Sequence, residues 1–160
     1  MDRKLEEKLF EKYPDIFFQK DLDMELTCMC WGLECGDGWY NIIDILCSLI
    51  QYEIKQFHAE VERYTLYIKT EDKNKRPIFV ERLNQVIETL TSDIQVVQVK
   101  EKFGTLRFYT NMPHEKIDAY IDFAEIISET TCEICGNPGT INDGGWLKVR
   151  CQEHKQCGLY

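Results

Sequence analysis

Two pairs of metal-ligating residues near the end of the chain constrain its fold more than any other feature. Cys132 and Cys135 form the first pair, Cys151 and His154 form the second, and 15 residues separate the pairs. Structural zinc takes four Cys or His ligands in a tetrahedron, and two close pairs on a chain that folds back supply this geometry. The pattern therefore predicts one structural zinc ion bound by these four residues. The alternative is a set of ordinary buried thiols with a surface histidine.

The segment between the two pairs carries the signals of a hairpin. Residues 142–145 read Asn-Asp-Gly-Gly, a composition typical of tight turns, and residues 146–150 can return as a strand. We therefore expect a zinc-ribbon or treble-clef-like module over residues 130–160, packed on an α+β domain over residues 1–129. Cys157 is not needed as a ligand.

The charge of the chain restricts its partners. A formal net charge of −9 and a pI near 4.9 argue against binding to generic nucleic acid, which depends on Lys and Arg at the phosphates. Most of the first eight residues are charged, and no apolar run approaches the length of a membrane span. We therefore expect a cytoplasmic protein without a membrane partner, whose eight cysteines are free or metal-bound.

Apolar periodicity predicts a mixed α+β domain with several helices and a β-hairpin. The expected hairpin pairs strands 94–102 and 105–110 through a tight connection at Phe103 and Gly104. A further strand is expected where residues 61–69 alternate weakly. Helices are expected over residues 2–13, 39–57, 77–93 and 113–129.

A glycine-rich stretch before the second helix is the first candidate ligand site. Gly36, Asp37 and Gly38 suggest a tight turn in which Asp37 caps the helix, and free backbone amides there can bind an anion. Glu34 and Asp37 can then contact sugar hydroxyls or base edges, and Trp39 can stack on a ring. The alternative is an ordered loop that caps the core through its tryptophans.

The expected β-hairpin supplies the second candidate. Lys100, Lys102, Arg107 and Tyr109 can project from one of its faces, where they suit an anionic or nucleotide-like ligand. The alternative is a charged face in contact with water.

Two other groups of residues carry weaker signals. Cys28, Cys30 and Cys35 leave a second metal site open, although their spacing does not form a zinc knuckle. His58 and His114 lie in no catalytic motif, and the pair Glu34 and Asp37 matches no known acid–base pattern. The sequence therefore favours a protein that is not an enzyme.

Three blocks of the chain resemble a family of small uncharacterised proteins from phages, prophages and bacteria. The blocks are residues 31–39 (WGLECGDGW), residues 100–109 (KEKFGTLRFY) and the Cys132–His154 segment. The resemblance brings no established activity and implies a cytoplasmic accessory protein of viral origin.

Two functions are expected in that setting. The first is a non-enzymatic binder of a small nucleotide-like or anionic ligand, which sequesters a host immune signal. The second is an acidic adaptor or inhibitor that binds a host protein, with zinc purely structural. Convergence of the glycine-rich turn and the hairpin on one pocket would favour the first function, and separate, packed positions would favour the second.

Overall fold

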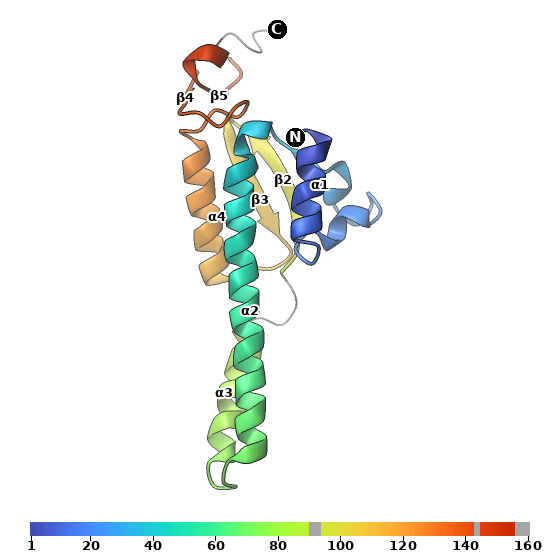
Figure 1. Cartoon of the computed structure of the whole chain (residues 1–160), viewed down its shortest axis with the longest axis vertical. Coiled ribbons are helices and arrows are strands. Elements are labelled where there is room, and N and C mark those ends of the chain that lie inside the picture. The colour runs from blue at the N-terminus through green and yellow to red at the C-terminus, as the bar shows by residue number, and fades with distance from the viewer. Residues whose placement is uncertain (90–93, 143–144, 156–160) are drawn as a thin grey trace.

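The computed structural model confirms a mixed α+β fold and describes residues 1–89, 94–142 and 145–155 (Figure 1). The helices are α1 (Arg3–Lys12), α2 (Tyr40–Thr70), α3 (Arg76–Thr89) and α4 (Glu115–Ser128). The strands are β1 (Leu33–Glu34), β2 (Val96–Lys102), β3 (Thr105–Thr110), β4 (Thr140–Ile141) and β5 (Val149–Arg150). Short 3₁₀ turns at Phe18–Asp21, Met29–Trp31, Asp37–Trp39 and Gln152–His154 complete the described elements.

Two small sheets organise the chain. In the first, the strand order is β1-β2-β3, with β1 parallel to β2 and β2 antiparallel to β3. In the second, β4 pairs antiparallel with β5 next to the C-terminal end of α4 (Figure 1). The larger sheet is covered by α2 and α4. These two helices run in opposite directions, since α2 starts near the second sheet and α4 ends there. Its core is apolar and includes Trp39, Ile43, Leu46, Ile50, Val99 and Leu106.

The strand predicted at residues 61–69 is wrong, because these residues continue α2 through Thr70. Phe57, Val61, Tyr64 and Ile68 recur at intervals of three or four residues, which is the period of a helix. Their β-branched and aromatic side chains suggested a strand, but the spacing decides the structure. The second half of α2 pairs with α3 to form a helical hairpin that extends away from the sheets (Figure 1). The expected end of the third helix at residues 90–93 lies outside the described residues.

The predicted hairpin is confirmed, and its turn has an unusual residue. Lys102 pairs with Thr105, so the turn consists of Phe103 and Gly104 alone. Both have positive φ angles, 55° and 84°, as a type I′ turn requires. Glycine adopts such angles easily, whereas a phenylalanine at positive φ is strained. The Phe103 side chain is nevertheless 67% exposed, so packing in the core does not explain its presence.

Candidate metal centre and predicted ligand residues

The four predicted metal ligands lie together. Their ligand atoms are all within 4.8 Å of one another. The Cys135 and Cys151 sulfurs are 3.7 Å apart, and His154 Nδ1 lies 3.2 Å from Cys151 Sγ and 3.7 Å from Cys132 Sγ. Ideal tetrahedral bonds of about 2.3 Å to sulfur place two thiolates about 3.8 Å apart. These distances are compatible with one tetrahedral metal ion held by the four side chains.

Backbone hydrogen bonds shape the first ligand pair into a knuckle. The Cys132 amide donates to the Asn137 carbonyl, and the Gly136 amide donates to the Cys132 carbonyl, both at 2.8 Å. Gly136 has a φ of 77°, which a side chain would oppose. Burial favours the neutral Cys132 thiol, but backbone amides around it outweigh that effect and lower its pKa to about 6. The knuckle therefore favours the thiolate that a metal requires.

The glycine-rich turn packs directly on this knuckle. The Gly38 amide donates to the Glu133 carbonyl at 2.8 Å, and the Gly36 amide donates to Glu133 Oε1 at 3.1 Å. Trp39 is fully buried, and its indole N–H donates to the Thr131 carbonyl at 2.9 Å. The expected anion site is therefore wrong at Gly36 and Gly38, because their amides already bind a part of the protein. The same burial removes Trp39 as a stacking surface.

Glu133 joins the three sequence blocks, and sequence reasoning missed it. Its buried carboxylate forms ion pairs with Arg150 at 2.9 Å and with Lys148 at 3.8 Å. Lys148 also pairs with Glu101, whose other oxygen accepts from the Gly104 amide at 2.6 Å. The three blocks therefore meet at the metal module. A signal existed in the sequence, since Lys148 and Arg150 alternate along one strand and present two cations to a single side.

Asp37 and Glu34 take separate positions. Asp37 Oδ1 accepts from the Asp2 amide at 2.6 Å, which joins the turn to the start of α1. The predicted cap is wrong, because Trp39 occupies the N-cap of α2 and no side chain bonds the first turn. Glu34 is exposed on β1, where its backbone is in register with Lys100.

The four hairpin residues share a strand face but not a pocket. Lys100 Nζ lies 5.7 Å from the centre of the Tyr109 ring, and both residues line an open groove of about 660 Å³ together with residues 24–28. Lys102 instead lies over the Phe103 ring, with Nζ at 5.4 Å. Arg107 turns to Glu125 on α4, with Nη1 3.0 Å from Oε2. The glycine-rich turn and the hairpin therefore do not converge on one pocket.

Replacement of Arg107 by alanine is expected to lower stability only slightly. The side chains of Arg107 and Glu125 are 29% and 22% exposed, so water screens their ion pair and its loss should cost about 1 kcal/mol. The melting temperature should fall by about 2–4 °C. A double-mutant cycle with Glu125→Gln isolates the pair. A loss larger than about 3 kcal/mol would show that Arg107 supports the fold in another way.

The three remaining candidate cysteines do not form a metal site. Cys35 is buried, and burial raises its pKa to about 12, which disfavours a thiolate ligand. The Cys30 thiol donates to the Thr27 carbonyl at 3.3 Å, while Cys28 is exposed beside the Lys100 groove. Within the described ranges, only the cluster of Cys132, Cys135, Cys151 and His154 brings three or more such ligands together.

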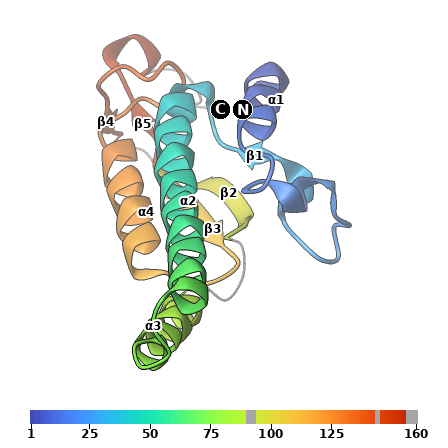
Figure 2. The same ribbon diagram turned by 60° about the horizontal axis from the view of Figure 1, so that its bottom comes forward.

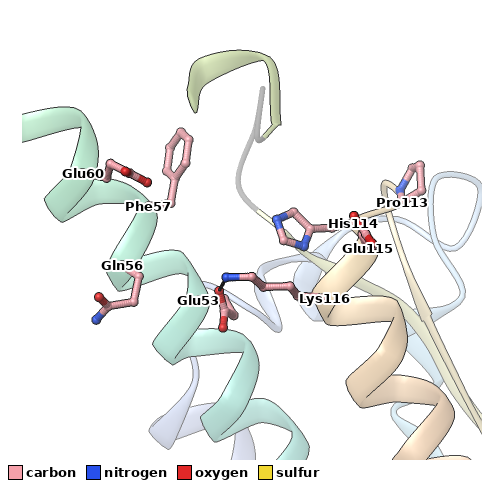
Figure 3. A pocket seen from close by; sticks show the side chains of 8 residues that line it. All are labelled: Glu53, Gln56, Phe57, Glu60, Pro113, His114, Glu115 and Lys116. Carbon is pink, nitrogen blue, oxygen red and sulfur yellow. Dashed lines mark hydrogen bonds and ion pairs between the residues drawn. The ribbon is translucent and has the colours of Figure 1, made fainter. Parts of the chain in front are cut away.

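A second groove lies between α2 and the start of α4 (Figure 3). It has a volume of about 480 Å³, with Phe57 and Glu60 on one side and His114 on the other. Two of its polar side chains already have structural partners. Glu53 pairs with Lys116 at 3.3 Å and accepts from the Tyr120 hydroxyl at 2.8 Å. His114 caps α4, and its Nδ1 accepts from the Ile117 amide at 3.4 Å. Glu53 thus joins α2 to α4, whereas His114 caps the start of α4.

None of the known protein families, curated proteins or solved structures matches this chain significantly. Among the described residues, no helix is both long enough and apolar enough to cross a membrane.

Proposed function

We propose that this protein is a non-enzymatic interaction protein, an adaptor or inhibitor, whose C-terminal module is held by structural zinc. Three thiols and one imidazole at tetrahedral spacing suit zinc, because soft sulfur and nitrogen donors select it over calcium or magnesium. All four positions are filled by the protein, which is the arrangement of a structural ion rather than a catalytic one.

A pair of exposed aromatic residues carries the proposal. Phe103 keeps a strained positive φ at the tip of the β2–β3 hairpin, where asparagine or glycine would relieve the strain. A β-carbon added at Gly104 would lie 3.3 Å from the Leu147 carbonyl carbon and 3.3 Å from the Lys148 amide nitrogen, so the hairpin tip lies against the backbone of these two residues. Trp146, adjacent in sequence, is 76% exposed. We call these two aromatic residues, Phe103 and Trp146, together with the neighbouring Leu147, the aromatic tip.

The aromatic tip has the composition of a protein-binding surface. Aromatic side chains dominate the energetics of protein interfaces, and strain retained at one exposed position supports a role outside folding. The net charge of −9 favours a basic protein surface over nucleic acid as the partner. In the phage-type setting that the sequence blocks suggest, we propose that the partner is a protein of the host cytoplasm.

A second candidate function is the binding of a small anionic ligand, such as a nucleotide-derived immune signal. It is favoured by the groove in which Lys100 lies against Tyr109, which offers one cation and one ring. Arg107, Lys102, Trp39 and Asp37 take no part in that groove. The ligand would therefore make fewer contacts than the sequence suggested. Screening the melting temperature against cyclic and ADP-ribose-type nucleotides tests this candidate.

The Phe103→Asn variant separates folding from partner binding. Asparagine fits a type I′ turn, so this variant should melt about 2–4 °C above the unaltered protein. Loss of the aromatic anchor should at the same time weaken partner binding at least tenfold. Binding is measured with partners recovered on the tagged protein from host lysate and then purified.

Phe123→Gln is the matched control, because Phe123 is an equally exposed aromatic residue on α4. It should retain the partner. A partner that binds Phe103→Asn and the unaltered protein equally would refute the aromatic tip as the binding surface. A nucleotide that raises the melting temperature, with no protein partner recovered, would replace this function with the second candidate.

A further inference from the structure

The helical hairpin that extends from the body lacks a buried core. We call residues 57–89, which comprise the second half of α2 and all of α3, the arm (Figures 1 and 2). From residue 57 to residue 88 no side chain is buried, although every residue in that range is described. Phe79 and Tyr67 pack with ring centres 5.0 Å apart, yet both remain partly accessible. Two helices alone cannot enclose these residues.

The apolar pattern of α3 is wider than its contact with α2 requires. Its apolar residues recur three to a heptad, which is typical of a helix that packs on two sides in a bundle. They are Phe79, Val80, Leu83, Val86 and Ile87. A helix with a single partner needs only two such positions in each heptad. Within the described residues, α2 is the only element with which α3 packs extensively. Val80 and Ile87, which are 42% and 43% exposed, border that contact.

The charge of the arm differs from that of the whole chain. Residues 57–89 hold six basic and six acidic residues, so the arm is neutral and the charge of −9 belongs to the rest of the protein. Electrostatic repulsion between two copies therefore acts mainly between the parts of the chain outside the arm, which we call the bodies. The arms extend away from the sheets, so two of them can meet while the bodies remain apart.

We propose that the arms of two copies of this chain pack together as a four-helix bundle. The contact is two-fold symmetric, because the same surface on each copy can bury its own equivalent. Val80 and Ile87 lie at its centre. Ile78 lies outside it because it points away from the α3 stripe that Phe79 and Leu83 define, and Leu66 lies outside it because it is opposite the α2 stripe of Val61, Tyr64 and Ile68. Burial of these side chains completes the core that the arm lacks on its own.

The size of the arm predicts the strength of this contact. A helix of 14 residues is about 21 Å long and about 10 Å wide, so the face formed by the two helices of the arm side by side covers roughly 400 Å² on each copy. That is smaller than the standard interface of about 800 Å² per partner, so we expect a reversible dimer with a micromolar dissociation constant. Its formation should depend on protein concentration.

Sedimentation equilibrium of the full chain between about 1 and 500 μM brackets that micromolar range and tests the proposal. The average mass should rise from 19.0 kDa toward twice that value as the concentration increases. The double variant Val80→Gln with Ile87→Gln should stay monomeric throughout. The control pair, Leu66→Gln with Ile78→Gln, removes comparably apolar and more exposed residues from the arm, one on α2 and one on α3, and it should associate like the unaltered protein.

Hydrogen exchange of the unaltered protein gives an independent readout. Amides of residues 57–89 should become more protected as concentration rises, while those of α4 should not change. A mass of 19.0 kDa at every concentration would overturn the proposal. Equal association of both variant pairs would also overturn it, because the dimer would then use another surface. If the Val80 and Ile87 variant loses helix, its mass no longer tests the contact. The concentration dependence of hydrogen exchange in the unaltered protein then decides the proposal.

Discussion

Removal of the metal is expected to unfold the C-terminal module and to loosen the start of α2 with it. Within the described part of the module, only Cys132, Glu133, Val149 and Cys151 are buried, so apolar packing there cannot replace the ion. Structural zinc contributes about 10–16 kcal/mol in small peptides at neutral pH. Loss of even about 4 kcal/mol of this stabilisation should lower the melting temperature of a domain of this size by about 10 °C or more.

The Cys135→Ser variant and a strong chelator should have the same effect. Metal analysis should find one zinc ion per chain in the unaltered protein and a reduced amount in the variant. Hydrogen exchange should rise at residues 36–39 as well as in the module, because Gly36, Gly38 and Trp39 donate hydrogen bonds to it. Cys28→Ser is the control, since Cys28 is an exposed thiol outside the cluster. Purified protein without metal, or equal melting of the two serine variants, would contradict this prediction.

The metal cluster could be predicted from sequence because its ligands follow local rules. The spacing of two residues within each pair defines a knuckle without reference to the rest of the chain. The turn at Phe103 and Gly104 was also predictable, since two residues between alternating strands define a hairpin. Neither inference required knowledge of distant contacts.

The positions of the candidate ligand residues could not be predicted, because each is set by a partner that is distant in the chain. Trp39, Asp37 and Arg107 are residue types that often bind ligands, yet here they bind Thr131, Asp2 and Glu125. Those partners lie 92, 35 and 18 residues away in the chain. A glycine-rich turn likewise suits either an anion or another backbone, and only the fold decides between them. The strand expected at residues 61–69 is wrong for a different reason, because the β-branched and aromatic residues there favour a strand while their spacing is that of a helix.

The substitution Gly38→Ala is expected to be among the most damaging single changes in the chain. A β-carbon at Gly38 would lie 2.1 Å from the Cys132 carbonyl oxygen, 2.4 Å from the Gly136 amide nitrogen and 2.8 Å from the Cys135 amide nitrogen. All three are backbone atoms of the knuckle, which cannot move without displacing the ligands Cys132 and Cys135. The added methyl group therefore forces either the turn or the metal centre out of place.

We expect Gly38→Ala to cost more than about 4 kcal/mol, which is exceptional for a single substitution. Zinc affinity, measured by competition with a chromophoric chelator, should fall in the same variant because Cys132 and Cys135 are displaced. Gly145→Ala is the matched control, since a β-carbon there meets nothing within 4 Å and its effect should stay within about 0.5 kcal/mol. If Gly38→Ala lost stability but kept full zinc affinity, the added methyl group would be displacing the glycine-rich turn and not the knuckle. If both alanine variants melted alike, the close contact between the glycine-rich turn and the metal module would be refuted.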